Sequence, residues 1–449
     1  MKKLFLKKTL ALALACIMCV CLFACAEDGA QTDTSALEGT SGIAESLFVG
    51  TQDTEGNTPD TENGGAQTQT PNKGENGENG ENKEEPPVPE DEHPNIKLTQ
   101  TLDSVPDVVG GNIKNVILII GDGMGLNHVK AAELATARQF EFDDWARVNV
   151  NTDSVKSDGK SLVLTDSAAA GTAMATGKLT VNGYIGKDHK GNDTNTLLDH
   201  AAVTYKKATG IVTTDYLHGA TPSSFSGHSM SRNNVESITV SQIVSGVNFL
   251  CGSVAPECTA RRAEIERTGY KYCESYANRR SVLGSKYAYC QFDMNGADAP
   301  VKLKDATMLA LEFLSSDPDG FVLVIEQAHV DKYSHSNDFA NMVKCASDLD
   351  ETVDTVLEWI GDRTDTAVFV TADHETGGLK VGEGSKSYTA PDGSKVSYAW
   401  STGSHTNSDV GLFVYGVAPE YEKLATYSSA TRVKNTDIFG LVLGAIRNE

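Results

Sequence analysis

Short runs of apolar residues recur between residues 115 and 415 and predict buried β-strands. Continuous apolar runs are typical of parallel strands that are covered on both faces. Helical patterns separate these runs, so the sequence predicts an α/β fold, a three-layer sandwich with a mostly parallel central sheet flanked by helices. The predicted strands are Asn115–Ile120, Ala208–Thr213, Phe321–Ile325, Thr366–Thr371 and Gly411–Tyr415.

A strongly periodic helix is predicted from Phe339 to Ile360, where apolar residues fall at steps of three and four. Ser336 or Asn337 can cap its start. The stretch 326–335 before it is then a loop at the carboxyl end of a strand, which is where open α/β sheets bind ligands.

Side chains that bind divalent metals follow several of the predicted strands. Any one of them has a plain alternative, a solvated loop or a structural histidine. Their convergence at one edge of one sheet favours a metal site, because together they supply about six ligands, enough for two ions with open positions for a substrate. The residues are Asp122, Asp331, His335, Asp373, His374 and His405.

A second predicted helix begins at Ser167. The following residues are rich in alanine, Asp166 can cap the helix and Gly177 can end it. A serine at a helix N-terminus lies where an anion is favoured, and coordination to a metal can activate its hydroxyl as a nucleophile. Without metals, an inert serine is the favoured interpretation. Arg232 could hold two oxygens of a phosphate group, although an isolated arginine is weak evidence.

Five motifs occur in order along the chain. They are Gly-Asp-Gly-Met-Gly at 121–125, Thr-Asp-Ser-Ala-Ala-Ala-Gly at 165–171, Thr221-Pro222 followed by Arg232, Glu326 with Asp331-Lys332 and His335, and Ala-Asp-His at 372–374 followed by His405-Thr406. Together they resemble the alkaline phosphatase family, and the resemblance spans Lys114 to Gly416.

The resemblance implies a role for each matching residue. Ser167 becomes the nucleophile that forms a phosphoseryl intermediate, and Arg232 binds the phosphate oxygens. One zinc ion is held by Asp331, His335 and His405, and a second by Asp122, Asp373 and His374.

A third ion, usually magnesium, is implied at Glu326, Thr221 and Asp122. The family usually has an aspartate or histidine two residues before the threonine. Here that position is Gly219, and His218 is one residue out of register, which puts the third ion in doubt. Lys332 matches a residue that some members use to reach phosphate through water.

The resemblance predicts phosphate monoester hydrolysis, with phosphodiester or sulfate ester hydrolysis as the alternative. Diesterase relatives often have a threonine nucleophile and lack the equivalents of Arg232 and Glu326. Sulfatases need a Cys/Ser-x-Pro-x-Arg pattern, which the sequence at Ser167 does not match. A non-catalytic surface protein is a further hypothesis, although no candidate zinc ligand is missing. Family members are often homodimers.

The N-terminus predicts export. Residues 1–25 combine four lysines with an apolar stretch that ends Leu-Phe-Ala-Cys25, which resembles a bacterial lipoprotein signal with Cys25 as the acylated residue. Phe23 departs from the usual small residue, so cleavage and release to the periplasm or medium is the alternative. Residues 26–110 hold 19 acidic residues against three lysines and predict a disordered tether, followed by a catalytic domain at 111–449.

The net charge of −23 argues against nucleic-acid binding. In the segment 247–301, an insertion that caps the site or forms a subunit contact is predicted, with a surface excursion of no special role as the alternative. Its four cysteines suggest two disulfides of unknown pairing. Cys345 on the predicted helix is expected to be a buried thiol. The four cysteines are Cys251, Cys258, Cys273 and Cys290.

Overall fold

The computed structural model describes residues 96–98, 113–417 and 432–447. The predicted signal segment 1–25 and nearly all of the predicted tether 26–110 lie outside the described residues. Within the described ranges, no helix combines the length and the apolar composition that a bilayer crossing needs.

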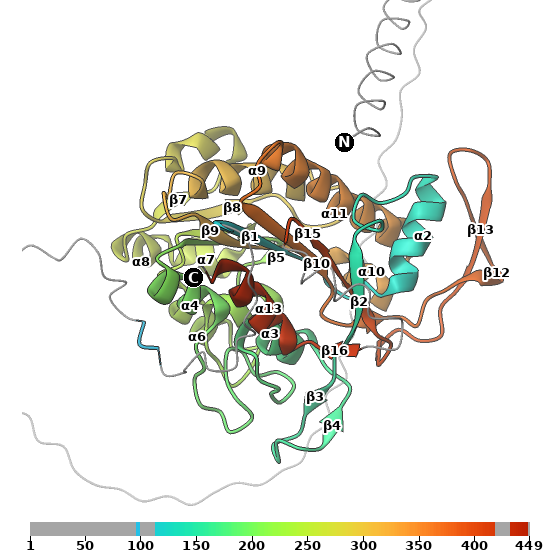
Figure 1. Cartoon of the computed structure of the whole chain (residues 1–449), viewed down its shortest axis with the longest axis horizontal. Coiled ribbons are helices and arrows are strands. Elements are labelled where there is room, and N and C mark those ends of the chain that lie inside the picture. The colour runs from blue at the N-terminus through green and yellow to red at the C-terminus, as the bar shows by residue number, and fades with distance from the viewer. Residues whose placement is uncertain (1–95, 99–112, 418–431, 448–449) are drawn as a thin grey trace, which may run out of the picture. The chain divides into compact units, whose positions relative to one another are not determined.

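A ten-stranded sheet forms the centre of the folded part, in the order β16-β2-β15-β10-β1-β9-β5-β6-β8-β7 (Figure 1). Only β15 runs antiparallel to its neighbours, so the predicted mostly parallel sheet is confirmed, and all five predicted strands are present. The strands are β1 (Asn115–Gly121), β2 (Ala146–Asn151), β5 (Ala208–Tyr216), β6 (Phe249–Ser253), β7 (Lys271–Cys273), β8 (Ala288–Phe292), β9 (Phe321–Gln327), β10 (Thr366–Thr371), β15 (Val410–Tyr415) and β16 (Arg432–Lys434).

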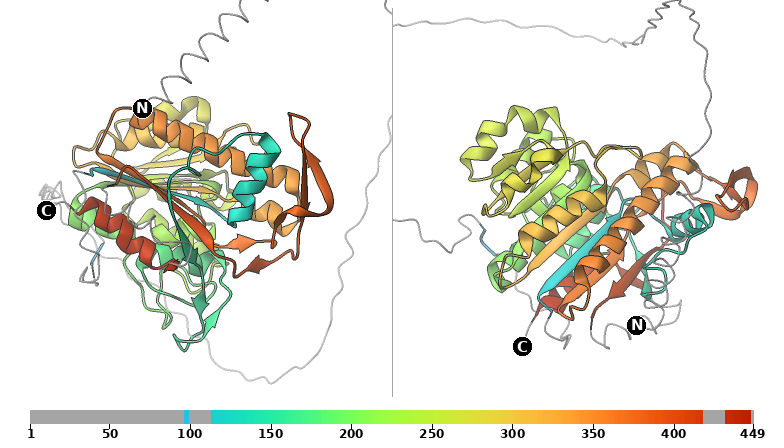
Figure 2. Two further views of the ribbon diagram at one scale, coloured as in Figure 1. Left: turned by 45° about the vertical axis from the view of Figure 1, so that its right-hand side comes forward. Right: turned by 90° about the horizontal axis from the view of Figure 1, so that it is seen from above.

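Helices cover both faces of this sheet, as predicted (Figures 1 and 2). One face carries α9 and α11, and the other carries α3, α4 and α13. The helices are α2 (Leu126–Thr136), α3 (Ser167–Thr176), α4 (Leu197–Tyr205), α5 (Ala220–Ser226), α6 (Val235–Ile243), α7 (Pro256–Ala260), α8 (Arg262–Arg267), the 3-10 helix η1 (Tyr276–Val282), α9 (Leu303–Leu314), α10 (His329–His335), α11 (Phe339–Ile360) and α13 (Asp437–Ile446).

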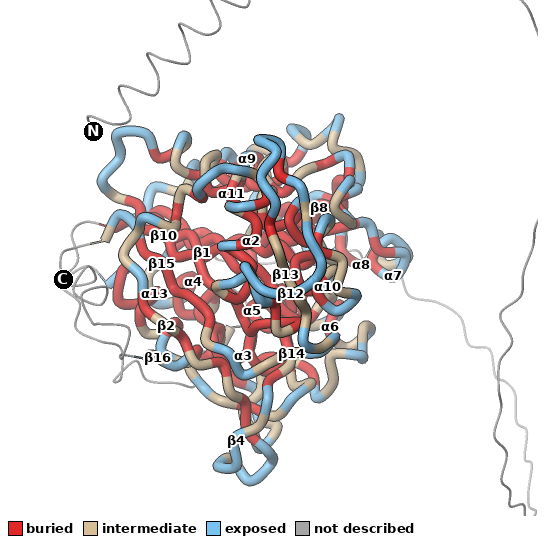
Figure 3. The backbone as a smooth tube through the Cα atoms, turned by 90° about the vertical axis from the view of Figure 1, so that its right-hand side faces the viewer, coloured by how far each residue is buried: buried red, intermediate tan, exposed pale blue. Residues whose placement is uncertain are grey.

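Three two-stranded pairs lie outside the main sheet. They are β3 (Ser154–Val155) with β4 (Leu162–Val163), β11 (Glu375–Thr376) with β14 (His405–Thr406), and β12 (Lys380–Thr389) with β13 (Lys395–Ala399). Most residues of β12 are exposed, whereas every residue of β1, β9 and β10 is buried (Figure 3). Burial on both faces explains why the central strands have continuous apolar sequences.

Helix α3 forms where the sequence predicts it. The Asp166 side chain accepts a hydrogen bond from the backbone N–H of Ala169 at 2.9 Å, which satisfies one of the free donors at the helix start. Gly177 ends the helix with a φ of 70°, a left-handed conformation that glycine adopts without strain. Ser167 is thereby fixed as the first helical residue.

Two local predictions around α11 are wrong. The stretch 329–335 forms helix α10 instead of a loop. Asp338, and neither Ser336 nor Asn337, caps α11 by accepting from Asn341 N at 3.2 Å. Asn337 instead takes a φ of 55° at the junction between the two helices.

The predicted insertion 247–301 is built into the central sheet. Strands β6, β8 and β7 continue the central sheet at one edge, because their residues pair in parallel register with β5 and with one another. The predicted disulfides are also absent from the described residues, where Cys251, Cys258, Cys273, Cys290 and Cys345 are buried free thiols. Three of these cysteines occupy paired positions on β6, β8 and β7, where they pack as small apolar side chains inside the sheet.

Candidate functional site

The carboxyl ends of four neighbouring strands, β10, β1, β9 and β5, bring the predicted residues to one edge of the sheet. Asp122 directly follows β1, and Glu326 is the sixth residue of β9. Ile120 pairs with both Glu326 and Thr371, so the ends of β1, β9 and β10 lie at the same level. The parallel register is the reason that residues 250 positions apart in sequence meet.

Asp122, Asp373 and His374 form a buried cluster, called the inner cluster below. One ligand atom from each lies within 4.8 Å of the others. His374 Nε2 is 3.4 Å from Asp122 Oδ1 and 3.3 Å from Asp373 Oδ2. The other Asp373 oxygen accepts from Gly123 N at 3.1 Å, which ties the cluster to the glycine-rich turn after β1.

Asp331, His335 and His405 form a second cluster by the same distance criterion, called the outer cluster below. His335 Nε2 is 3.3 Å from Asp331 Oδ2, and His405 Nε2 is 3.6 Å from Asp331 Oδ1. Asp331 and His335 lie one turn apart on α10. His405 arrives on β14, which pairs with β11 directly after His374, so the rings of His374 and His405 stack 3.6 Å apart.

Hydrogen bonds fix the orientation of all three imidazole rings. His335 Nδ1 donates to the Gly403 carbonyl at 2.8 Å, and His405 Nδ1 donates to the Thr165 carbonyl at 2.9 Å. Thr376 Oγ1 donates to Asp331 and therefore accepts from His374 Nδ1 at 3.2 Å. Each Nε2 lone pair then points into the site, which is the arrangement of a histidine that binds a metal.

The unpaired atoms of the two clusters fit bound cations. His335 Nε2 and His405 Nε2 are 3.2 Å apart, and two lone pairs at that distance repel unless a proton or cation lies between them. Asp122 Oδ1 and Asp373 Oδ2 are buried without a hydrogen-bond partner. Carboxylate and imidazole ligands in threes, with space for a further ligand, are typical of catalytic zinc sites.

Burial and mutual repulsion explain the pKa shifts of the inner cluster. Loss of hydration raises the pKa of Asp373 to about 6 and raises that of Asp122 well above its ordinary value. Burial also lowers the pKa of His374 to about 4, so the ring is neutral at pH 7. A bound divalent cation would stabilise the ionised carboxylates that burial alone disfavours.

Ser167 lies beside the inner cluster. Its Oγ atom is 3.2 Å from His374 Nε2, and the residue is buried at the N-terminus of α3. The Ser167 hydroxyl, Asp122 and Asp373 therefore all lie within 3.4 Å of the same atom, His374 Nε2. The structure brings the predicted nucleophile within reach of the predicted metal ligands.

Arg232 is held beside the start of α3. Its Nη1 atom donates to Asp166 Oδ2 at 3.2 Å, and its backbone N–H donates to the Gly183 carbonyl at 2.8 Å. About a third of the side chain is exposed, so guanidinium donors remain for an anion. Asp166 thus both caps the helix that carries Ser167 and orients Arg232. The sequence predicted the helix cap at Asp166 but not the ion pair between Asp166 and Arg232.

Glu326 and Thr221, two residues of the predicted third site, lie close together in the interior. Glu326 accepts a hydrogen bond from Thr213 Oγ1, and Thr221 interacts with it closely enough to lower its pKa. Burial nevertheless raises the pKa of Glu326 to about 8. His218 points elsewhere, because its Nε2 atom lies 3.8 Å from Glu257 and its ring packs against Tyr216.

Lys332 lies on α10 between the ligands of the outer cluster. Its Nζ atom donates to Asp215 Oδ1 at 2.5 Å, at the end of β5. Asp215 was not among the predicted site residues. It follows the apolar run Ala208–Thr213 by two positions, so the rule that located Asp122 and Asp373 would also have located it.

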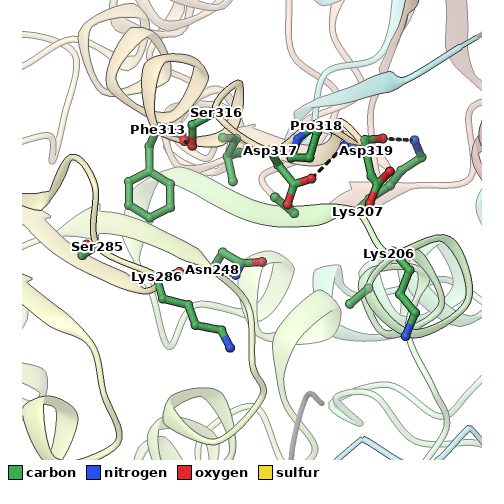
Figure 4. A pocket seen from close by; sticks show the side chains of 13 residues that line it. Lys206, Lys207, Asn248, Ser285, Lys286, Phe313, Ser316, Asp317, Pro318 and Asp319 are labelled. Atoms are coloured by element: carbon green, nitrogen blue, oxygen red, sulfur yellow. Dashed lines mark hydrogen bonds between the residues drawn. The ribbon is translucent and has the colours of Figure 1, made fainter. Parts of the chain in front are cut away.

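A cavity of about 650 Å³ lies far from these residues, where β5, β6, β8 and β9 begin (Figure 4). Lys206, Lys207, Asn248 and Lys286 line it together with the loop 316–319. Lys207 Nζ donates to the carbonyls of Lys114 and Asp319 at 2.7 Å each. None of the predicted site residues lines this cavity.

Comparisons with known proteins agree with the arrangement at the carboxyl edge. Residues 113–265 and 286–438 match the family model described as alkaline phosphatase, which leaves 266–285 in the segment of β7 and η1 unmatched. The chain is 31% identical to alkaline phosphatase 3 of Bacillus subtilis over 296 residues, which cover 60% of this chain and 63% of the relative. It is 28% identical to alkaline phosphatase of Escherichia coli over 58% of this chain and 70% of the relative.

Solved structures give the same result. The alkaline phosphatase from the Antarctic bacterium TAB5 superposes with a TM-score of 0.65 at 26% identity, covering 75% of this chain and 98% of that one. A variant of that enzyme with magnesium bound in its M3 site gives 0.65 at 25% identity, with the same coverage. The family match spans most of the described sheet and both clusters, and the chain belongs to the alkaline phosphatase family.

Proposed function

We propose that this protein hydrolyses phosphate monoesters through a phosphoserine intermediate on Ser167, with two zinc ions in the inner and outer clusters. The placement of Ser167 Oγ, 3.2 Å from His374 Nε2, carries the proposal because it puts the hydroxyl next to the inner ligands. The alignments with the first two Bacillus subtilis relatives span 63% and 65% of their lengths, so their printed activity is a proposal for this chain.

The residues have distinct tasks in this reaction. Ser167 Oγ attacks phosphorus, the P–O bond to the alcohol breaks, and water later displaces the serine from the phosphoryl group. Arg232, oriented by Asp166, holds the non-bridging oxygens while charge redistributes over them. When bound, the two zinc ions would supply positive charge to the entering and leaving oxygens of the in-line displacement.

The substrate class follows from the same contacts. A monoester carries three non-bridging oxygens and two negative charges, whereas a diester carries two such oxygens and one charge. Arg232 together with two divalent cations would therefore bind the dianionic monoester more strongly. We therefore expect kcat/KM for p-nitrophenyl phosphate to exceed that for bis(p-nitrophenyl) phosphate. A preference for the diester would assign the chain to the alternative reaction.

The decisive experiment combines a nucleophile variant with metal removal. Ser167→Ala should abolish p-nitrophenyl phosphate hydrolysis while keeping the zinc content of the parent protein, because Ser167 is not a member of either cluster. EDTA should also abolish hydrolysis, and zinc should restore it. Activity that survives EDTA would contradict the zinc assignment. A phosphoserine trapped at another serine of the Ser167→Ala variant would contradict the assignment of Ser167 as the nucleophile.

Export and anchoring are a separate proposal. We propose that residues 1–25 direct export, that Cys25 carries an acyl chain, and that 26–110 tethers the catalytic domain to the membrane. Cys25→Ala should abolish labelling by a radioactive fatty acid and release the protein from the membrane fraction. Equal membrane retention by this variant would contradict anchoring through Cys25. A homodimer is a prediction of the family resemblance, which sedimentation analysis of the purified protein can test.

A further inference from the structure

The third site lacks its usual side chain at position 219, and another carboxylate occupies the neighbouring space. A Cβ atom built on Gly219 would lie 2.8 Å from Asp215 Oδ2, 2.9 Å from the backbone carbonyl oxygen of Tyr216 and 3.3 Å from Asp215 Cγ. Real Cβ contacts essentially never fall below 3.0 Å. A side chain at position 219 and the observed position of Asp215 therefore exclude each other.

Asp215 faces the interior group around Glu326. Its backbone N–H donates to Thr213 Oγ1 at 2.9 Å, and Thr213 Oγ1 donates onward to Glu326 Oε2. After burial, the negative charge of Asp215 is the largest cause that raises the pKa of the Glu326 carboxyl group. Two carboxylates thus repel each other across this space.

An independent sign of a missing partner comes from Thr221. Its Oγ1 atom is buried, with 1% of the residue exposed, and makes no hydrogen bond of normal geometry among the described residues. Glu326 is 2% exposed and lies on the adjacent side of the same space. A buried hydroxyl that lies beside the Glu326 carboxylate without a well-aligned hydrogen bond, next to a second carboxylate, fits a site for a hard cation.

We propose that Asp215 completes the third cation site in place of the residue missing at position 219, and that the glycine there makes room for it. This inference rests on the proposed function. The cation expected is magnesium, because the ligand atoms are carboxylate and hydroxyl oxygens only. Magnesium keeps several of its waters when bound, so Asp215 can act through a bound water while Glu326 and Thr221 bind directly.

Lys332 gives Asp215 a second task. Asp215 Oδ1 accepts from Lys332 Nζ at 2.5 Å, whereas Oδ2 points toward position 219. One carboxylate therefore links the cation site to a lysine on the helix that carries Asp331 and His335. The link makes Asp215 a positioning residue for Lys332 and a binding residue for the cation.

The test measures magnesium binding directly. The purified protein is stripped of metal, reloaded with two equivalents of zinc, and titrated with magnesium in a calorimeter. Asp215→Asn should bind magnesium at least about tenfold more weakly while retaining both zinc ions. The double variant Asp215→Ala/Gly219→Asp, which moves the carboxylate back to the usual position, should recover most of the affinity. Asp409→Asn is the matched control, because Asp409 also pairs with a basic residue at a similar burial but lies outside the site.

The outcomes separate this inference from the proposed function. Absence of zinc binding and of p-nitrophenyl phosphate hydrolysis in the parent protein would refute the function. A parent that hydrolyses the substrate with two zinc ions but binds no magnesium, or an Asp215→Asn variant whose magnesium affinity stays within twofold, would overturn the role of Asp215. If Asp215→Asn does not fold, Asp215→Ala supplies the same test, because it removes the carboxylate without adding an atom near the backbone oxygen of Tyr216.

Discussion

The inner and outer clusters contain similar ligands, yet their surroundings differ. In the inner cluster, Asp373 and His374 have no exposed surface, and every ligand lies within three residues of the end of a central strand. In the outer cluster, the His335 side chain is 42% exposed, and the ligands come from a short helix and a two-residue strand. The sheet builds the inner cluster, whereas peripheral elements build the outer one.

This difference suits two tasks. A nucleophile must be held in one position, and Ser167 lies against the buried His374, whose ring is fixed by Thr376 and packed on His405. A leaving alcohol and an incoming water must reach solvent, and the partly exposed His335 makes the outer cluster the more accessible of the two. We therefore infer that the inner cluster activates the serine and the outer cluster serves the leaving group.

The largest expected effect is loss of an inner ligand. Asp373→Ala should lower kcat/KM by about a thousandfold or more, because it removes one of the three ligands of the cluster beside the nucleophile. His335→Ala, the matched change in the outer cluster, should cost about a hundredfold, since solvent can replace an exposed ligand. The comparison requires kcat/KM and zinc content for both variants. Equal losses of kcat/KM would show that the difference in burial does not make the two clusters functionally different.

The two clusters should also lose their metals to a chelator at different rates. A chelator would reach a metal in the outer cluster past the exposed His335, whereas a metal in the inner cluster would be surrounded by the buried Asp373 and His374. Zinc release followed with a colorimetric indicator should therefore show a fast and a slow phase of equal amplitude, and activity should disappear with the fast one. A single phase would mean that the two sites open together.

Thr376 joins the two clusters, and its removal should weaken both. It donates to Asp331 Oδ1 at 2.5 Å and accepts from His374 Nδ1. Thr376→Val should lower zinc affinity by roughly ten- to a hundredfold, as is usual when a partner of a metal ligand is lost. Thr371→Val is the control, because Thr371 is equally buried but donates to the Gly411 carbonyl. A loss confined to one cluster would show that the other orients its ligand independently.

The sequence predicts the inner cluster better than the outer one, for a physical reason. Asp122, Asp373 and His374 follow apolar runs, and parallel strands bring their carboxyl ends to one edge whatever the intervening loops do. His405 reaches the site through a two-residue pairing with β11 that spans the excursion 377–404, and through its hydrogen bond to the Thr165 carbonyl, neither of which a local pattern specifies. The family motif identified His405, whereas the pattern of apolar residues around it did not.

The same contrast explains the errors. Cys251 and Cys290 looked like disulfide candidates because sequence spacing does not show that they are neighbours on parallel strands within the core. The segment 247–301 holds no catalytic motif and clusters four cysteines with several basic residues, which favoured an insertion, and the pairing of its strands with β5 is not visible in the local sequence. Asp215 was missed because its strand extends beyond the apolar run to Tyr216.

The smallest expected effect concerns the protons released when zinc binds. In the metal-free protein, the hydrogen bond with Asp331 raises the pKa of His335 to about 9, so this ring is protonated at pH 7.5. His374, with its pKa lowered to about 4, is already neutral. Zinc needs the lone pair on Nε2, so binding at the outer cluster must expel the His335 proton, and outer-site affinity should rise with pH up to about 9.

Calorimetry in buffers of different ionisation enthalpy counts the protons released on zinc binding, and His335→Gln should lower the count by about one. An unchanged count would mean that the proton leaves from a carboxylate of the inner cluster, and that burial rather than exposure controls how metal binding depends on pH.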